Sequence, residues 1–469
     1  MPKLTVIENG KKREIEFFGE TILGDLLKSE GVEVEHPCGG KGVCGKCLVK
    51  INGKDELSCK YLLSRDTTVE IPEKRGISSV TGAVEDGEIS GNACLCLDIG
   101  TTTLALALVS PESGKTAKVL TATNPQRAFG ADVISRIDFC RKNGVEQLKA
   151  SVIKAVCEMT DEILSCFKLT YADKMYVSGN TTMLHCFFGV DCSSMGVSPY
   201  TPEFLGSKRM SGRELGLDKV GEVVSLPNIS AFVGADIVAG IGYVGAPKKG
   251  YNLLVDLGTN AEIALFDGQR TLCATAAAGP CFEGVNISCG MSASSGAVCA
   301  YFGEGDYKTI GDSDAKGLCA TGLVDVIAVS LKSEIIDESG YMEDDLVISG
   351  GVALTPKDVR EFQLAKSAVV SAIECLFTKA GITVNELENI YVAGGFSSGL
   401  NVANAVYVGL LPKGAEKLFV PVNNSSLLGT VKYACGQIEL GFVEGAEFVD
   451  VSSTGEFSER FFDNMSFEV

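Results

Sequence analysis

Four cysteines near the start of the chain have the residue type and the spacing of a metal centre. They lie in HPCGGKGVCGKCLVKINGKDELSC with the spacing C-x5-C-x2-C-x11-C, whose first gap is one residue longer than in the plant-type iron–sulfur run. Glycines between them permit a tight loop that turns backbone N–H groups toward the sulfurs. A zinc site is the alternative, but zinc modules usually have a second close cysteine pair, whereas the fourth cysteine here stands alone. The pattern predicts a 2Fe-2S cluster with four ligands, Cys38, Cys44, Cys47 and Cys59.

The segments around these cysteines predict a small domain that could hold such a loop. KLTVIE and REIEFF alternate apolar and polar residues on either side of the turn NGKK, which is typical of a β-hairpin. A short helix is expected from about Thr21 to Ser29, and LVKI after the third cysteine indicates a further strand. This order is typical of a β-grasp module and resembles the 2Fe-2S ferredoxins of the adrenodoxin-like spacing class. The resemblance implies the transfer of single electrons.

The composition of the whole chain is that of a globular protein of about three domains. It has 469 residues, 45% of them hydrophobic, and a formal net charge of -19. Because the chain has no long basic run, neither nucleic acid nor an anionic membrane surface is expected as a partner. With no apolar stretch of about 18 residues and no signal-peptide pattern, no membrane span is expected and the cytoplasm is the expected location. The 18 cysteines, most of them in apolar stretches, indicate a reducing cytosol such as that of an anaerobe.

Two further segments repeat one pattern that suits phosphate binding. The apolar strand ACLCLDIG runs into TTTLALALV, and YNLLVDLGTNAEIALF repeats the same order 158 residues later, which predicts an internal duplication. Hydroxyl and backbone N–H groups at such turns can donate to phosphate, and a carboxylate at the strand end suits hydrated Mg2+. The candidate residues are Asp98, Gly100, Thr101, Thr102 and Thr103 in the first copy, and Asp256, Gly258, Thr259 and Asn260 in the second.

A third segment, IYVAGGFSSG, places Gly394 and Gly395 at a turn after another strand. In this order the three segments resemble the paired phosphate motifs and the adenosine motif of the acetate and sugar kinase, heat-shock cognate and actin superfamily. The resemblance implies two ribonuclease-H-like halves that close over ATP with Mg2+. The expected fold is an α+β β-grasp ferredoxin domain followed by an α/β, two-lobed, ribonuclease-H-like (actin-like) ATPase. The alternative for each single segment is a hairpin with a solvated aspartate.

One aspartate between the two phosphate segments is a candidate catalytic residue. Asp236 follows an apolar strand and begins an apolar, glycine-spaced helix twenty residues before Asp256. In sugar kinases of the superfamily a general-base aspartate has a comparable place, so Asp236 could orient the attacking water. The competing interpretation is an N-cap that serves only the helix.

Four other polar residues lie near these motifs without a settled role. The helix expected from DVISRIDFC, after the turn NPQ, carries Asp132 and Arg136. These two could line the cleft or lie on a solvated face, with a slight preference for the cleft. No role follows from the sequence for Asn180 or Glu283.

Shifts in composition divide the chain. After about Arg75 the segment GISSVTGAVEDGEISGNA is rich in glycine and serine, which indicates a flexible linker. The expected divisions are the ferredoxin domain at 1–78, the linker at 79–92, the first ATPase subdomain at 93–248, the second at 249–441 and a C-terminal segment of the ATPase at 442–469.

Longer stretches look like one branch of the superfamily, the reductive activators of corrinoid proteins. Among them are NPQRAFGADVISRIDF, AAGPCFEGVNISCGM and GGFSSGLNVANAVYVGLLP, and the resemblance extends from Cys38 to the last residues. Members of this family couple an N-terminal 2Fe-2S ferredoxin domain to the ATPase. The resemblance implies ATP-dependent reductive activation, in which one electron returns cob(II)alamin of a corrinoid protein to cob(I)alamin. It also implies an upstream low-potential electron donor, and a homodimer is a possible assembly.

The chain departs from the family in its length and at two single positions, with Ser397 where glycine is common and Cys281 where alanine is usual. Two other functions also stay open. Well-known members have an additional middle domain between linker and ATPase, and this chain has room only for the short linker, which puts the partner interface in question. A small-molecule kinase with an appended ferredoxin domain would use Asp236 to deprotonate a substrate hydroxyl. A plain 2Fe-2S electron-transfer protein would carry a vestigial ATPase, although both aspartates and both glycine turns of an active cleft are retained.

Overall fold

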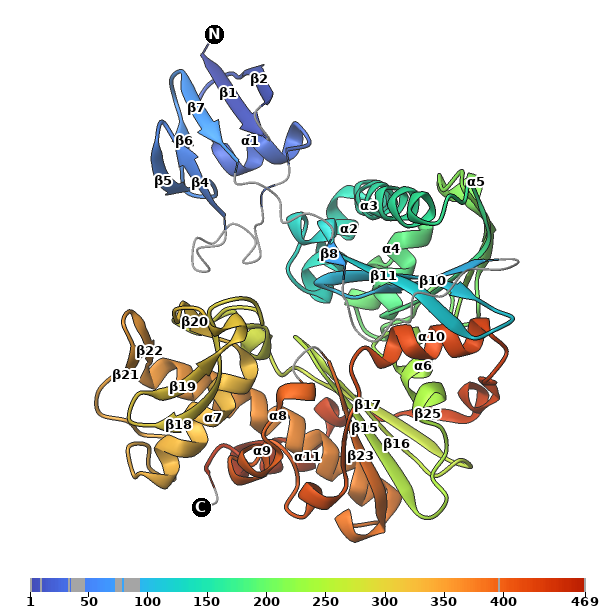
Figure 1. The fold of residues 1–469 in the computed structure, drawn as a ribbon, viewed down its shortest axis with the longest axis vertical. Helices are drawn as coiled ribbons and strands as arrows, with labels where there is room; N and C mark the ends of the chain where they lie inside the picture. Colours follow the sequence, from blue (N-terminus) through green and yellow to red (C-terminus); the bar gives the residue numbers. More distant parts are fainter. Residues whose placement is uncertain are drawn as a thin grey trace. The chain divides into compact units, whose positions relative to one another are not determined.

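The computed structural model describes residues 2–8, 11–32, 34, 47–71, 78–79, 93–394 and 397–467 (Figure 1). Its chain divides into two units. The first comprises Met1–Pro227 and Thr430–Gln437, and the second comprises Asn228–Gly429 and Ile438–Val469. Cys38, Cys44, Gly395 and most of the expected linker lie outside the described residues.

The N-terminal module of the first unit is a five-stranded sheet with one helix. Its elements are β1 (Lys3–Glu8), β2 (Lys11–Glu16), β3 (Thr21–Ile22), α1 (Leu23–Ser29), β4 (Leu48–Ile51), β5 (Lys54–Leu57), β6 (Leu62–Leu63) and β7 (Thr67–Glu70). The sheet order is β2-β1-β7-β4-β5, with the expected β1–β2 hairpin and with β1 parallel to β7. Alternate residues of β1, Leu4 and Val6, are buried in one core with Leu23 and Leu27 of α1. The helix begins two residues later than expected because β3 pairs with β6.

The rest of the first unit is built on a seven-stranded sheet. Its elements are β8 (Ser78–Ser79), β9 (Cys94–Ile99), β10 (Thr103–Ser110), β11 (Lys115–Thr123), α2 (Val133–Asn143), α3 (Glu146–Cys166), β12 (Ala172–Gly179), α4 (Thr181–Phe188), β13 (Arg209–Ser211), α5 (Gly212–Leu215) and β14 (Val220–Ser225). The order is β13-β14-β12-β9-β10-β11-β8. The strands β9, β10 and β11 are antiparallel, whereas β12 runs parallel to β9 and β14 parallel to β12. Every residue of β9 is buried, which explains the continuous apolar run in the sequence.

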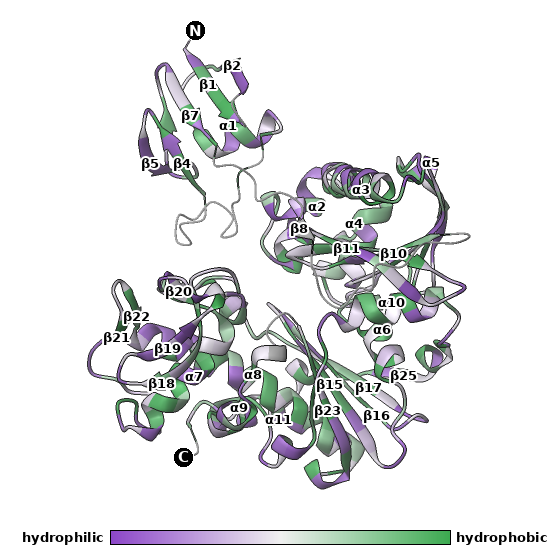
Figure 2. Ribbon diagram, viewed as in Figure 1, coloured by the Kyte–Doolittle hydropathy of each residue, from purple (hydrophilic) through white to green (hydrophobic). Residues whose placement is uncertain are grey.

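The main sheet of the second unit repeats this plan. Its strands are β15 (Tyr251–Leu257), β16 (Ala261–Phe266), β17 (Thr271–Ala276), β23 (Leu387–Ala393), β24 (Phe419–Pro421) and β25 (Ala446–Phe448), and hydrophobic residues make up most of β15 (Figure 2). The order is β24-β23-β15-β16-β17-β25. Three antiparallel strands come first, and the next two run parallel on the other side of the first strand, as in the first unit. The duplication predicted from the repeated segments is therefore present as a repeated topology.

Helices and two small sheets complete the second unit. The helices are α6 (Ala235–Val244), α7 (Ala320–Lys332), α8 (Pro356–Ala380), α9 (Val402–Tyr407), α10 (Ser425–Ala434) and α11 (Gly455–Asp463), of which α10 ends in the first unit. The small sheets consist of β18 (Ala297–Gly303), β19 (Asp306–Thr309) and β20 (Gly317–Leu318), and of β21 (Leu346–Ser349) and β22 (Val352–Leu354). The C-terminal segment belongs to this unit, since β25 pairs with β17 and α11 packs on α8.

The two compact units divide the chain between Pro227 and Asn228, before the boundary expected between the two halves. Helix α6 falls within 93–248, the range expected for the first half, but it belongs to the second unit. Its apolar residues Ile237 and Ile241 are buried with Leu254 and Ala264 of the second sheet. A helix belongs to the unit whose sheet buries its apolar face. Position along the sequence does not reveal which sheet that is.

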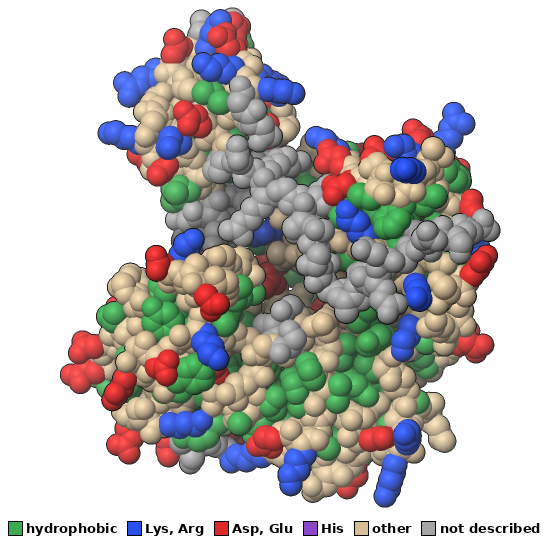
Figure 3. Space-filling model, viewed as in Figure 1, with side chains coloured by type: hydrophobic (Ala, Val, Ile, Leu, Met, Phe, Trp, Pro, Cys, Tyr) green, Lys and Arg blue, Asp and Glu red, His purple; other side chains and the backbone are tan. Residues whose placement is uncertain are grey.

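The surface carries charges of both signs, and the thiols are mostly inside. Figure 3 shows acidic and basic side chains interspersed over the visible face. Among the described residues, no helix is both long and apolar enough to cross a membrane.

Every described cysteine is a free thiol and most are buried. Burial raises the pKa of Cys273 to about 12 and that of Cys375 to about 11, whereas Cys166 in α3 is exposed.

Candidate functional site

Two of the four predicted cluster ligands are brought together by the β4–β5 hairpin. Leu48 pairs with Leu57 across this hairpin, and the N–H of Ser58 donates to the carbonyl oxygen of Cys47 at 3.0 Å. The Sγ atoms of Cys47 and Cys59 lie 3.2 Å apart, and both side chains are buried. The last gap in the cysteine spacing is therefore the length of a hairpin that returns the chain to its starting point.

This pair of thiols fits a metal–sulfur centre. In zinc thiolates, metal–sulfur bonds of about 2.3 Å in tetrahedral geometry place two sulfurs of one ion about 3.7 Å apart. The two sulfurs are at 3.2 Å, so they would need to separate by only about half an ångström to ligate one ion. Cys38 and Cys44 lie outside the described residues, so their part of the ligand set stays a prediction.

The first phosphate turn connects β9 to β10 through Gly100, Thr101 and Thr102. The N–H of Gly100 donates to the carbonyl oxygen of Thr103 at 3.0 Å. A Cβ atom at position 100 would lie 2.7 Å from that oxygen, so the turn requires glycine there. Asp98 stands near the end of β9 with only 8% of its side chain exposed. The structure thus brings all five predicted residues of the first motif to one tight turn and the two strands, β9 and β10, that it joins.

Two side chains whose role the sequence left open, or did not mention, hold this turn by its carbonyl groups. Nδ2 of Asn124 donates to the carbonyl oxygen of Gly100 at 2.8 Å. Arg136 is fully buried and donates from Nη2 to the carbonyl oxygen of Thr101 at 2.5 Å and from Nε to that of Gly130 at 3.0 Å. Arg136 is therefore a positioning residue for the phosphate turn, and the solvated-face interpretation is wrong for it.

Asp132 and Asn180 are helix caps. Oδ1 of Asp132 accepts a hydrogen bond from the N–H of Ser135 at 2.7 Å, and the Ser135 hydroxyl oxygen accepts one from the N–H of Asp132 at 3.1 Å. Oδ1 of Asn180 accepts from the N–H of Thr182 at 3.1 Å at the start of α4. These bonds satisfy N–H groups that a helix leaves unpaired at its first turn.

Replacing Arg136 with methionine tests its positioning role. We expect the free energy of unfolding to fall by about 2–6 kcal/mol, because the carbonyl groups of Thr101 and Gly130 each lose a partner, at about 1–3 kcal/mol apiece. Denaturant titration followed by circular dichroism measures this change. Arg141 on the same helix is the matched control. Its side chain is 57% exposed, and it forms an ion pair with Asp138 of the same helix. Arg141→Met should cost less than about 1 kcal/mol, and an equal cost for both variants would contradict the assignment.

The second phosphate turn, residues 258–260, lies beside the third motif. β23 runs parallel to β15, with Asp256 opposite the last residue of β23. A Cβ atom at Gly394 would lie 3.4 Å from Oδ1 of Asp256 and 3.0 Å from the carbonyl oxygen of Leu257. Gly394 has a φ angle of 100°, a conformation that favours glycine. The second unit therefore brings the second phosphate motif and the expected adenosine motif together, although Gly395 lies outside the described residues.

Glu283 also contacts the second phosphate turn, which sequence reasoning missed. It ends the short helical turn η3 (Pro280–Glu283). Its Oε1 accepts hydrogen bonds from the backbone N–H of Thr259 at 3.0 Å and from the Thr259 hydroxyl at 2.6 Å. The only sequence signal was that GPCFEG is one of the segments that carry the family resemblance.

Asp236 lies in the first turn of α6 but is not its N-cap. The cap position is Gly234, and Oδ1 of Asn228 accepts a hydrogen bond from the N–H of Ala235 at 3.1 Å. Oδ1 of Asp236 accepts from the N–H of Ile237 at 2.9 Å, and the residue is half-buried. The N-cap interpretation is therefore wrong in position, and the catalytic role of Asp236 stays a prediction.

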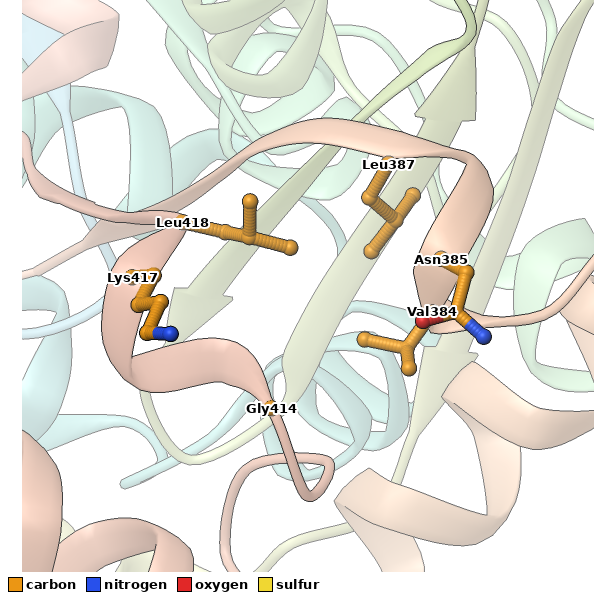
Figure 4. Close-up of a pocket in the computed structure, with 6 residues that line it drawn as sticks. All are labelled: Val384, Asn385, Leu387, Gly414, Lys417 and Leu418. Carbon is orange, nitrogen blue, oxygen red and sulfur yellow. The ribbon is translucent and has the colours of Figure 1, made fainter.

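A hollow of about 200 Å³ lies elsewhere in the second unit (Figure 4). Its lining consists of Val384, Asn385, Leu387, Gly414, Lys417 and Leu418. Leu387 is the first residue of β23 and Gly394 follows the last, so the strand separates the hollow from the phosphate motif by about 20 Å. The hollow is therefore not part of the candidate nucleotide site.

Models of known families cover nearly the whole chain. Residues 6–96 match the 2Fe-2S iron-sulfur cluster binding domain. Residues 93–249 match the RACo middle region, and residues 250–469 match the C-terminal domain of RACo, the ASKHA domain. The segment expected to be the first ATPase subdomain is thus what this family calls its middle region, so a region of that description is present in the chain.

Two individual relatives agree with these family matches. The corrinoid activation enzyme RamQ of Eubacterium limosum is 26% identical over 584 aligned residues, which cover 97% of this chain and 98% of RamQ. That aligned length exceeds the 469 residues here, so RamQ has residues that this chain lacks. The [Co(II) methylated amine-specific corrinoid protein] reductase of Methanosarcina barkeri is 28% identical over 374 residues, or 71% of this chain and 68% of the reductase.

A solved structure shows the same fold. The reductive activator for corrinoid, iron-sulfur protein superposes with a TM-score of 0.73 over 100% of this chain and 98% of its own, at 23% identity. The family assignment comes from the two contiguous RACo matches, which together span residues 93–469. The chain belongs to the RACo family, with a 2Fe-2S ferredoxin domain in front of an actin-like ATPase.

Proposed function

We propose that the protein is an ATP-dependent reductive activator of a corrinoid protein, which it returns from the cob(II) to the cob(I) state with one electron. The observation that carries this proposal is that one chain joins a 2Fe-2S domain to both regions of the RACo family. Two relatives that align with most of the chain are named as a corrinoid activation enzyme and a corrinoid protein reductase, which supports the same activity here. The kinase and the plain electron-transfer alternatives have no such support.

The need for ATP follows from the energetics of the reduction. For a one-electron couple, each 59 mV of unfavourable potential difference lowers the equilibrium constant tenfold. A deficit of a few hundred millivolts, on the order expected for cob(II) with ordinary cellular donors, therefore makes unaided transfer negligible. ATP binding or hydrolysis can shift this equilibrium only if it changes the relative affinity of the activator for the two cobalt states.

The residues of the two turns have distinct roles in this proposal. Asp98 and Asp256 hold hydrated Mg2+, and the hydroxyl and N–H groups of the two turns replace the water lost by the phosphates. Asp236 orients the attacking water. The 2Fe-2S cluster, when bound, supplies a single electron. Cys47 and Cys59 hold their part of it in a buried position, which limits access of water to the sulfurs.

The partners follow from the same reaction. We propose a cobalamin-carrying corrinoid protein as the acceptor and a low-potential electron donor upstream, with a homodimer as the assembly to be tested. The cytoplasm is the proposed compartment, because the described cysteines are free thiols, as expected in a reducing environment.

A reduction assay tests the proposal. The full-length protein, a low-potential reductant and ATP are mixed with a candidate corrinoid protein, and the cob(II) and cob(I) absorbance bands are followed. We expect cob(I) to form only when ATP is present, and we expect hydrolysis to be slow without the corrinoid protein and to rise with its cob(II) form. Full-length Cys59→Ser is the matched control, which should retain partner-stimulated hydrolysis but lose reduction. Equal reduction with and without ATP would refute the mechanism.

A further inference from the structure

In the second phosphate turn, a carboxylate accepts hydrogen bonds from the donor groups that would bind a phosphate. Oε1 of Glu283 accepts hydrogen bonds from both the backbone N–H and the hydroxyl of Thr259, at 3.0 and 2.6 Å. It is also close to the neighbouring residue, since a Cβ atom at Gly258 would lie 3.9 Å from the same oxygen. An N–H and an O–H that converge on one anionic oxygen form the arrangement by which such turns bind phosphate oxygens.

The first phosphate turn is held in the opposite way. Asn124 and Arg136 donate hydrogen bonds to the carbonyl oxygens of Gly100 and Thr101. These contacts fix the turn without using its donor groups.

The backbone of the segment that carries Glu283 is held in place by its packing. Gly284, directly after Glu283, packs tightly, because a Cβ atom there would lie 2.5 Å from the backbone nitrogen of Met291. Further on, the buried Asp358 accepts hydrogen bonds from the N–H and the hydroxyl of Ser288 at 2.7 and 3.0 Å. On the other side, Gly279 has a φ angle of 75° and no atom within 4 Å of the position of a Cβ. Because Cys281 and Phe282 of η3 are buried in the core and Glu283 itself is half-buried, Glu283 can leave Thr259 by rotation of its own side chain while the backbone of η3 stays in place.

We propose that the Glu283 carboxylate competes with a nucleotide phosphate for Thr259, so that ATP binds the second turn by displacing Glu283. This inference rests on the proposed function, because it assigns the phosphate to the same turn. Glu283 is then a positioning residue that lowers the affinity for nucleotide phosphate. A purely structural role would require the opposite, namely that Glu283 holds Thr259 in the geometry that binds phosphate.

The sign of an affinity change distinguishes the two roles. Calorimetric titration of full-length protein with MgATP should give a dissociation constant about tenfold lower for Glu283→Gln than for the parent, because an uncharged acceptor competes less well than a carboxylate. Adenosine carries no phosphate, so its dissociation constant should be unchanged. Glu283→Ala removes both oxygens and should shift the MgATP affinity in the same direction, which provides a second variant.

A matched control separates competition at Thr259 from a general loss of negative charge. Glu361 contacts Asn286 of the same segment at 3.5 Å and has no contact with Thr259. Glu361→Gln makes the same change of charge and should alter the MgATP affinity by less than about twofold. An equal gain in Glu361→Gln and Glu283→Gln would overturn the proposal.

The remaining outcomes also decide between the proposals. If the parent binds MgATP and both Glu283 variants bind it equally or more weakly, the competition is refuted while the ATPase function stands. Tighter binding of adenosine and MgATP alike would also refute it. If neither the parent nor any variant binds MgATP, the proposed function fails and this inference fails with it.

Discussion

Replacing Cys59 with serine is expected to remove most of the iron, the sulfide and the visible absorbance of the purified protein. The Cys59 sulfur is buried and lies 3.2 Å from that of Cys47, so the pair forms half of the ligand set that the spacing predicts. Serine keeps the size of the side chain but is a poor ligand for iron, which prefers thiolate in such clusters. Iron and sulfide analysis together with the visible spectrum measures the loss. Cys44→Ser should behave in the same way if the predicted four-ligand set is complete.

The control for this variant is another cysteine of the same unit. Cys166 is exposed and ends α3, remote in sequence from the four cysteines of the cluster loop. Cys166→Ser lowers the thiol count by the same number and should leave iron content and absorbance unchanged. An unaltered spectrum in Cys59→Ser, or an equal loss in Cys166→Ser, would contradict the cluster assignment.

Alanine at Asp98 or at Asp256 is expected to abolish ATP hydrolysis while the cluster absorbance stays intact. Asp98 lies near the end of β9 and Asp256 near the end of β15, each just before one of the two turns. Loss of a group that stabilises the charge of the transferring phosphate typically lowers a rate by a factor on the order of 10²–10³. A coupled assay for released phosphate measures hydrolysis in the presence of the corrinoid protein.

Asp138→Ala is the matched control for these two variants. Asp138 is an exposed aspartate of α2 that pairs with Arg141 and Lys142, so its loss removes a carboxylate without touching either turn. Both neighbours lower the pKa of Asp138, with the hydrogen bond from Lys142 as the larger cause. Hydrolysis at the parental rate in either the Asp98 or the Asp256 variant would show that the paired turns do not bind the nucleotide as proposed.

The parts of the site that the sequence predicted are those formed by neighbours along the chain. Cys47 and Cys59 could be recognised because a single hairpin joins them, and Gly100 because the turn closes within three residues. The repeated segments also predicted the repeated sheet order, since an apolar strand followed by a glycine turn is a local pattern.

The parts that the sequence did not predict depend on contacts between distant positions. Arg136 reaches Thr101 across 35 residues, and Glu283 reaches Thr259 across 24. Hydrophobic periodicity and capping rules describe one element at a time, so they could place Arg136 on a helix but could not decide which way its side chain points. The same limit explains why the sequence did not reveal that α6 buries its apolar face against the second sheet.

The burial of the thiols has a practical consequence for spectroscopy. Thiol reagents such as maleimides react with the thiolate, so a cysteine that is inaccessible and has a raised pKa, such as Cys273, reacts slowly near neutral pH. Cys166 is the exposed cysteine among the described residues. Of the described cysteines, brief labelling of the parent protein should therefore modify Cys166 at the end of α3 first, without engineering the sequence. A probe there would report on the first half of the ATPase while the iron–sulfur domain supplies its own absorbance.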